Sequence, residues 1–261
     1  MVIPRSVQLK LDRATHHLTT LQEQVESFLA DKPYAERRVL EHNGHDHVFV
    51  WDKFSPTPDV FALIAGDAVH NLRSALDHLA FALAEAGAHK KAASLSPAQA
   101  ARIEFPITRS EDDFLQKLGR GVLRNVEPNA KAFIEVSQPY RSSLPHPEAH
   151  FLSIIAKLDN TDKHRTLNIT GWAASVQKDN WPSALHGIEF QRPRTPRYES
   201  GAEIGRFVFD VPQAESAVPV SFGWGVQIPI PGRVPYEICA LIRGFLRDTQ
   251  VGIVDPLVRY L

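Results

Sequence analysis

Residues 59–86 read DVFALIAGDAVHNLRSALDHLAFALAEA, and this stretch decides the fold. It contains no proline, and Gly66 is its only strong helix breaker. Alanine and leucine dominate it, and both favour a helix. We therefore predict one long helix over residues 59–86. One side of that helix is apolar, and the opposite arc of about 140° is polar. This polar arc consists of Asp67, His70, Asn71, Ser74, Asp77 and His78, with Arg73 at its edge.

The polar arc differs in composition from a helix face exposed to water. Exposed faces are usually rich in Lys and Glu, whereas this arc has neither and uses histidine and short side chains. Leu63 and Phe81 lie in the same direction at its two ends, which indicates that other elements cover it. Covered polar groups need partners. A functional site, a structural network and a solvated face all remain open, and we favour the functional site.

A second polar group lies in LDNTDKHRTL, residues 158–167. The preceding segment, residues 147–159, has the apolar spacing of a helix. If this helix continues for one more turn, Asp162 points inward; if it stops at Asn160, the segment is an ordinary turn. The sequence leaves open whether this group meets the polar arc. Three possible cations follow directly and can hold one phosphate or carboxylate group: Lys163, His164 and Arg165.

Outside these segments, the pattern predicts further helices and strands. Helical recurrence over residues 6–31 predicts an amphipathic helix. An Asn-Gly dipeptide between two strand-like runs predicts a β-hairpin over residues 37–51. Alternation and turn residues predict a small antiparallel β section near residues 165–230, and a final helix is expected over residues 235–250. Three histidines around the hairpin turn are interpreted as exposed turn residues rather than metal ligands: His42, His45 and His47.

These elements predict an α+β fold with a predominantly helical bundle core. The helical part comprises residues 1–160 and contains the hairpin as an N-terminal insertion. The β section and the last helix follow it. Since the chain shows no internal repeat, no low-complexity tract and no long linker, we predict a single domain over residues 1–261.

Composition excludes several classes of protein. The formal net charge of −1 provides no overall field that attracts nucleic acid. The single cysteine, Cys239, excludes an internal disulfide and a cysteine-rich zinc module and suits a reducing cytosol. The N-terminus lacks the pattern of a signal peptide, and no apolar run approaches the roughly 18 to 20 residues that span a bilayer. We expect a cytoplasmic protein without a membrane partner.

Arg73 and His78 are separated by four residues on the predicted helix. This spacing resembles the R-x4-6-H motif of the HEPN superfamily, helical proteins that often act as metal-independent endoribonucleases. The resemblance implies that Arg73 and His78 form the catalytic pair, that the chain is a homodimer and that RNA is its substrate, with no cofactor. Ser74 suits the motif, whereas the hairpin, the β section and the early position of the motif helix depart from a minimal HEPN bundle. The combination of HNLRSALDH, QPY and NTDKHR also resembles uncharacterised bacterial and phage proteins.

In the endoribonuclease interpretation, histidines transfer protons and cations bind phosphate. His78 would act as general base or general acid, because free imidazole titrates near neutral pH. Arg73 would stabilise the extra negative charge on phosphorus. His70 would be oriented by Asp77 or share the proton transfer. The expected substrate-binding residues are Asn71, Ser74, Lys163, His164 and Arg165.

Two alternatives use the same features differently. In the first, a metal ion activates water for hydrolysis, bound by His70, Asp77 and His78, with Asp162 or His164. One helix presents two of the first three ligands easily and all three only with strain, which favours the metal-free interpretation. In the second, the β section is a non-catalytic binding platform and the polar arc serves dimerisation. Its aromatic residues are interpreted as core or edge packing: Trp172, Trp181, Phe222 and Trp224.

Overall fold

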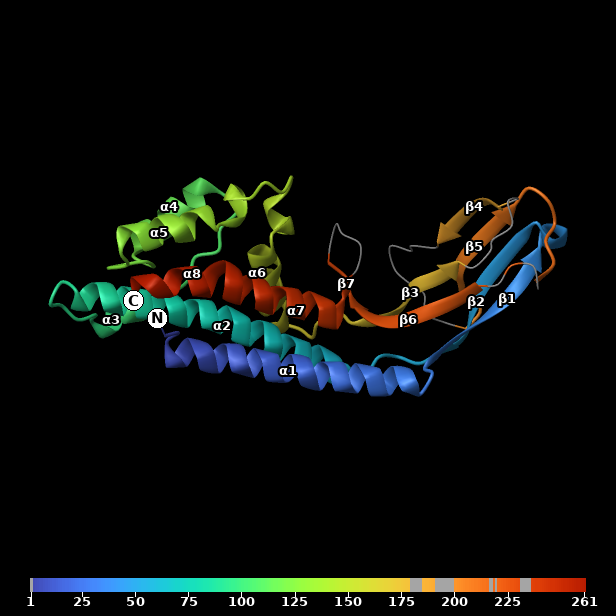
Figure 1. Ribbon diagram of the computed structural model, residues 1–261, viewed down its shortest axis with the longest axis horizontal. Coiled ribbons are helices and arrows are strands. Elements are labelled where there is room, and N and C mark those ends of the chain that lie inside the picture. Colours follow the sequence, from blue (N-terminus) through green and yellow to red (C-terminus); the bar gives the residue numbers. More distant parts are fainter. Residues whose placement is uncertain (1, 179–184, 191–199, 216–217, 219, 231–235) are drawn as a thin grey trace. The chain divides into compact units, whose positions relative to one another are not determined.

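The chain forms two compact units in the computed structural model (Figure 1). The helical unit comprises Met1–Gln22, Asp59–Asn168 and Ile238–Leu261, and the β unit comprises Glu23–Pro58 and Ile169–Glu237. The two units confirm an α+β fold with a helical bundle and antiparallel sheets. A single domain stays a prediction. The structure describes residues 2–178, 185–190, 200–215, 218, 220–230 and 236–261.

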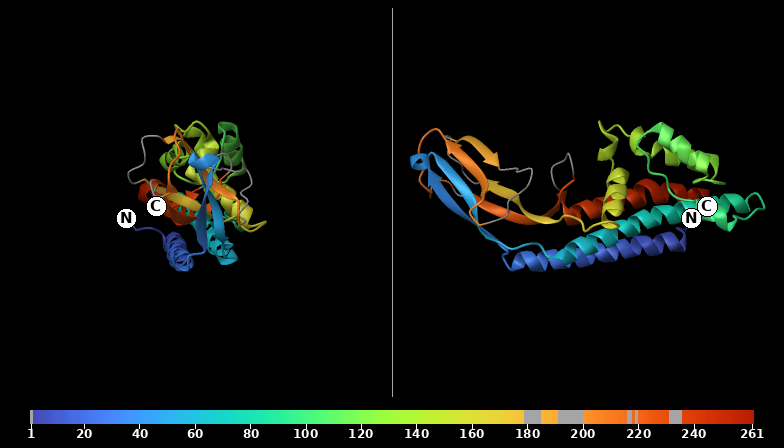
Figure 2. Two further views of the ribbon diagram at one scale, coloured as in Figure 1. Left: turned by 90° about the vertical axis from the view of Figure 1, so that its right-hand side faces the viewer. Right: turned by 180° about the vertical axis from the view of Figure 1, so that it is seen from behind.

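The helical unit is built around α2 (Asp59–His89), which confirms the predicted central helix and extends it by three residues. Contacts with α2 come from α6 (Phe151–Asp162) and α7 (Ile238–Thr249), and α1 (Arg5–Ala30) runs beside it (Figures 1 and 2). Shorter helices complete the unit: α3 (Pro97–Ala100), α4 (Glu111–Arg120), α5 (Pro128–Val136) and α8 (Asp255–Leu257). Single 3-10 or π turns lie at Pro139–Arg141, Pro147–Ala149, Gln250–Val254 and Val258–Tyr260.

The core of the helical unit lies along the apolar side of α2. Leu72, Leu76, Leu79 and Leu83 are fully buried there, because residues three or four apart share one face of a helix. Within the described ranges, no helix is both long enough and apolar enough to cross a membrane.

The β unit contains two antiparallel sheets. The larger sheet has the order β1-β2-β5-β4 and is formed by β1 (Tyr34–Glu41), β2 (Asp46–Phe54), β5 (Glu203–Phe209) and β4 (Leu185–Phe190). The smaller sheet has the order β3-β6-β7 and is formed by β3 (Thr170–Lys178), β6 (Val220–Ile228) and β7 (Tyr236–Glu237). Strands β1 and β2 are the predicted hairpin. In their connecting turn, Asn43 and Gly44 have φ values of 56° and 89°, which asparagine and glycine tolerate best.

The smaller sheet and the aromatic core of the β unit bear on two of the predictions. The last helix begins at Ile238 rather than at residue 235, because Tyr236 and Glu237 pair with β6. Phe222 and Trp224 pack against the aromatic core of the β unit, with the Trp51 and Trp224 ring centroids 4.7 Å apart. This agrees with their interpretation as packing residues; Trp172 lies in β3, and Trp181 lies outside the described residues.

Candidate functional site

The two polar groups of the sequence meet where α6 crosses α2. Helix α6 begins at Phe151 rather than at residue 147, because Pro147–Ala149 form a separate 3-10 turn, and it continues to Asp162, which is the later of the two predicted ends. The Nδ1 atom of His70 lies 2.9 Å from Oδ1 of Asp159. The Nζ atom of Lys163 lies 2.6 Å from the other carboxylate oxygen. Asp159 is buried, with 6% of its side chain exposed, while 49% of His70 remains exposed. A buried carboxylate therefore holds a half-exposed imidazole.

The hydrogen bonds of His70 determine which of its ring nitrogens can accept a proton. An ionised carboxylate only accepts hydrogen bonds, so Nδ1 donates to Asp159 and the lone pair of a neutral ring lies on Nε2. The Ser74 hydroxyl oxygen lies 3.5 Å from Nε2. Other helical hydroxyls, such as Thr15 and Thr161, donate to the backbone carbonyl four residues earlier. An imidazole oriented in this way by a carboxylate is the arrangement of a general base.

Asp77 has a different partner from the one predicted. Its Oδ1 atom lies 3.0 Å from Nη2 of Arg73 and accepts the backbone N–H of Phe105 at 2.8 Å. Asp77 follows His70 by seven residues, which separates them by about 10 Å along the helix axis, and Asp159 is the carboxylate that orients His70. Arg73 is mostly buried, and its Nη1 atom has no partner among the described residues. Asp77 thus ties α2 to the segment that contains Phe105, and Arg73 is its ion-pair partner within α2.

The pKa of Asp77 predicts a pH effect on stability. Burial raises it, and Glu104 and Asp159 add to the increase, whereas Arg73 and the Phe105 N–H lower it. A carboxyl whose pKa is higher in the folded protein contributes most stability below its ordinary pKa, and this contribution is lost as the pH rises through the raised pKa. We expect Asp77→Asn to cost more unfolding free energy at pH 4 than at pH 7, as measured by urea denaturation. A difference that grows with pH would contradict this assignment.

Asp162 lies against the backbone of α2. A Cβ atom at Gly66 would lie 2.2 Å from Oδ1 of Asp162, so any larger residue there would displace this carboxylate. Burial raises the pKa of Asp162, and the neighbouring Asp67 and Asp159 raise it further, while His70 lowers it. Asp162 therefore points inward, as the longer helix predicts, and belongs to the same polar group as His70.

Helix α1 contributes to the other side of the polar arc. The Nζ atom of Lys10 lies 3.4 Å from Oδ1 of Asn71, and the Asn71 amide donates to the backbone carbonyl of Asp67 at 2.8 Å. His17 on α1 is buried, and burial lowers its pKa, as does Arg13, while Asp67 opposes this effect. The arc is therefore flanked by α1 as well as by α6.

The rest of the predicted site is more open. Leu63 and Phe81 are 58% and 37% exposed, so the expected cover at the two ends of the arc is not found. The α6 helix and the Phe105 segment cover only its middle. His78 is half-buried, and its ring has no hydrogen-bond or ion-pair partner in the described part of the chain. His164 and Arg165 are exposed at the end of α6.

Two residues of this site, Asp159 and Lys10, were not among the predicted site residues. Asp159 follows Ile155 by four residues, so it shares the buried face of α6. A carboxylate on a buried face needs a partner, and this signal could have found it. No comparable signal marks Lys10, because its contact with Asn71 depends on how two helices that are far apart in sequence pack together.

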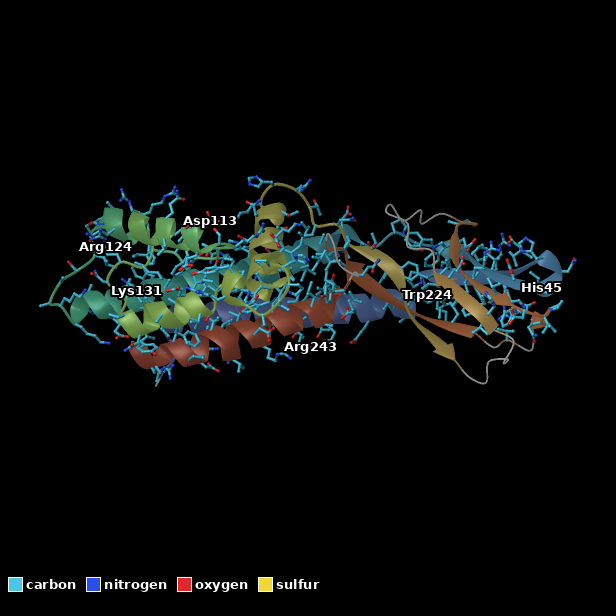
Figure 3. All side chains as sticks on the ribbon, turned by 90° about the horizontal axis from the view of Figure 1, so that it is seen from above. His45, Asp113, Arg124, Lys131, Trp224 and Arg243 are labelled. Carbon is cyan, nitrogen blue, oxygen red and sulfur yellow. The ribbon has the colours of Figure 1, made fainter. Side chains whose placement is uncertain are left out.

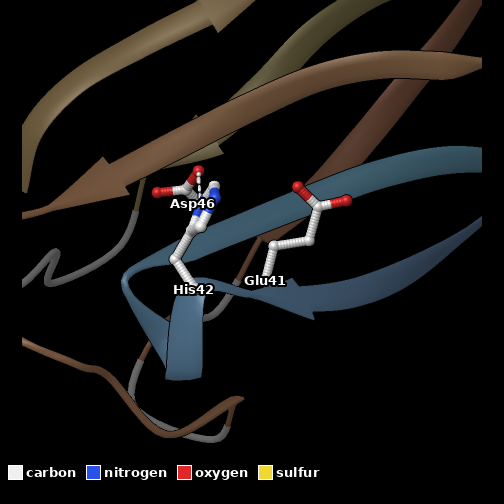
Figure 4. Close-up of side chains that lie close together, drawn as sticks. All are labelled: Glu41, His42 and Asp46. Carbon is white, nitrogen blue, oxygen red and sulfur yellow. Dashed lines mark hydrogen bonds and ion pairs between the residues drawn. The ribbon is translucent and has the colours of Figure 1, made fainter.

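The possible metal ligands whose donor atoms lie closest to one another are in the β unit. Among the described residues, Glu41, His42 and Asp46 form the one group of three whose donor atoms all lie within 4.8 Å of one another (Figure 4). The Nη1 atom of Arg206 lies 2.6 Å from Asp46 and 2.8 Å from Glu41. The guanidinium already supplies the positive charge there, which identifies an ion network between the hairpin and β5. The alternative metal ligands on α2, on α6 and directly after α6 form no such group within the described ranges: His70, Asp77, His78, Asp162 and His164.

The histidines around the hairpin turn differ in burial. His42 is exposed, as predicted. His47 is completely buried, and its Nε2 atom lies 3.0 Å from the backbone oxygen of Gln213. The prediction of an exposed turn residue is wrong for His47, because it lies in β2 and packs against the ring of Phe209. His45 is partly buried beside the Phe209 carbonyl.

Comparison with known proteins provides no relative. No protein-family model, no curated protein and no solved structure matches the chain. The function of the α2–α6 site is therefore inferred from its contacts and charges.

Proposed function

We propose that the helical unit is a metal-independent endoribonuclease in which His70 is the general base. The observation that carries this proposal is the hydrogen bond from His70 to the buried Asp159. The carboxylate holds the ring in one tautomer and stabilises the imidazolium that forms when Nε2 takes a proton. About half of the His70 side chain is exposed, which supports access of a substrate hydroxyl to Nε2, and the Ser74 hydroxyl lies 3.5 Å from this nitrogen.

The reaction that suits this base is attack by the RNA's own 2′-hydroxyl. Nε2 of His70 takes the 2′-hydroxyl proton, the 2′-oxygen forms a bond to the adjacent phosphorus, and the bond from phosphorus to the 5′-oxygen breaks. The leaving oxygen takes a proton, and the products are a 2′,3′-cyclic phosphate and a 5′-hydroxyl. RNA supplies the nucleophile, so the site must supply proton transfer and positive charge.

Cations around the base can bind phosphate. Lys163 contacts the same carboxylate as His70 and is about half exposed. Because His70 and the Lys163 ammonium group contact the same carboxylate, a phosphate that reaches His70 also lies near this ammonium group. Lys10 lies on the other side of the arc, and Arg165 follows at the end of α6. These charges support binding of a phosphodiester.

Arg73 and His78, which the HEPN resemblance assigns as the catalytic pair, remain part of the proposal. His78 follows His70 by eight residues, which places it about 12 Å away along the helix axis. One phosphate cannot contact both rings of a single chain at that separation. The homodimer implied by the resemblance would let His78 of a second copy protonate the leaving oxygen. We also place this activity in the cytoplasm, which suits the single buried cysteine.

The test is cleavage of a single-stranded RNA in excess EDTA. We expect cleavage, with 2′,3′-cyclic phosphate ends detected by mass spectrometry. A strand of the same sequence with 2′-O-methyl groups is the matched control, and it should stay intact because it has no free 2′-hydroxyl. Intact RNA, or cleavage of the 2′-O-methyl strand, would overturn the proposal.

A further inference from the structure

A surface pocket of about 340 Å³ lies between α4 and α5, in a part of the helical unit not assigned to the proposed active site. The loop after α4 forms much of its wall, and α5 contributes Lys131. Its lining residues are Leu118, Gly119, Gly121, Leu123, Arg124, Asn125 and Lys131. The volume is at the lower end of the range for small-molecule sites.

The pocket contains two cations without acidic partners. Arg124 and Lys131 form no ion pair in the part of the chain that the structure describes. By contrast, Lys117 on α4 pairs with Glu104. Figure 3 shows Arg124 and Lys131 at the same end of the α4 and α5 pair, with Asp113 farther along α4. The pocket lining therefore carries two positive charges and no negative charge.

The local backbone keeps this end of α4 open. Gly121 ends α4 with a φ of 85°, a conformation that favours glycine. A Cβ atom there would lie 3.6 Å from Nε of Arg124, so the guanidinium lies over this glycine. Gly119 has no atom within 4 Å of its possible Cβ among the described residues. The cations are thus next to unfilled surface rather than packed side chains.

We propose that this pocket binds a phosphomonoester. At neutral pH a phosphomonoester carries nearly two negative charges, which matches the charges of Arg124 and Lys131. The planar guanidinium can bind two phosphate oxygens, the ammonium group can bind a third, and the Asn125 amide can donate to a bridging oxygen. Leu118 and Leu123 provide apolar surface for the carbon atoms next to the phosphate. A diester or a carboxylate carries one charge and fits the pair less well.

The experiment is calorimetric titration of the full chain at low ionic strength. The probes are inorganic phosphate, ribose 5-phosphate, ribose and dimethyl phosphate. We expect ribose 5-phosphate to bind at least about tenfold more tightly than dimethyl phosphate, and ribose not to bind. Tighter binding of ribose 5-phosphate than of inorganic phosphate identifies an organic phosphomonoester as the ligand, and equal binding identifies phosphate itself. No binding of either, or equal binding of ribose, overturns the proposal.

Variants show whether the pocket is the binding site. Arg124→Gln and Lys131→Gln should each weaken binding of ribose 5-phosphate by about ten- to a hundredfold, the loss expected for one charge-assisted hydrogen bond. Arg120→Gln is the matched control, because Arg120 is exposed on the last turn of α4 and does not line the pocket. It should weaken binding by about two- to threefold. An equal loss in all three variants would indicate unspecific attraction and overturn the site. RNA cleavage should not change in any of them.

Discussion

RNA cleavage by His70→Gln is expected to be about 10² to 10⁴ times slower than cleavage by the wild-type protein. Glutamine can still donate a hydrogen bond to Asp159, but its amide cannot take a proton from a 2′-hydroxyl. The variant should therefore lose the base while keeping the contact between α2 and α6. Initial rates on a single-stranded RNA in excess EDTA, with melting temperatures measured in parallel, provide the test.

Asp159→Asn removes the carboxylate that orients the base, while the base itself, His70, stays in place. Asparagine is the same size, but it carries no charge to stabilise the imidazolium of His70. We expect a large loss of rate here too, although the imidazole remains. His89→Gln is the matched control, because His89 is an exposed histidine at the end of the same helix. If His70→Gln cleaves RNA at the wild-type rate while His78→Gln does not, catalysis belongs to the Arg73 and His78 pair and the role of His70 is wrong.

The main elements of the fold could be predicted because local patterns determine them. The long central helix follows from a stretch without proline in which leucines recur every three or four residues. The β1–β2 hairpin follows from its Asn-Gly turn, where asparagine and glycine suit the positive φ that His42 shares with them. The start of α7 was harder to predict, because the helical pattern of the residues that follow does not show that Tyr236 and Glu237 pair with β6.

The candidate site could be predicted only in part. Helical periodicity placed His70, Asn71 and Ser74 on one arc, which is a property of α2 alone. The partner of His70 comes from α6, so periodicity within α2 could not identify it, although the seven-residue spacing between His70 and Asp77 argues against Asp77. The ion pair between Arg73 and Asp77 was visible as residues four apart on a helix. That spacing favours a structural contact and thus competes with a catalytic role for Arg73.

Gly66→Ala is expected to lower the unfolding free energy by about 1–2 kcal/mol and to slow RNA cleavage. The new Cβ atom would overlap the Asp162 carboxylate, and overpacking of this kind costs about 1–3 kcal/mol. Alanine regains up to about 1 kcal/mol from its better helix propensity. Displacement of Asp162 also moves the last turn of α6, which carries Asp159 and is followed directly by Lys163, so the base loses its orientation. Urea denaturation measures the first effect and initial rates measure the second.

Two further variants show whether steric overlap or helix propensity determines the effect of Gly66→Ala on the unfolding free energy. Gly244→Ala lies in α7, where no atom of the described residues is within 4 Å of the new Cβ. It should raise the unfolding free energy by about 0.5–1 kcal/mol. In an Asp162→Ala background the carboxylate is absent, so Gly66→Ala should become stabilising as well. This change of sign depends on the contact between Gly66 and Asp162, because propensity is the same in both backgrounds. If Gly66→Ala stabilises the wild-type protein as Gly244→Ala does, α6 does not approach α2 closely enough for Asp159 to hold His70.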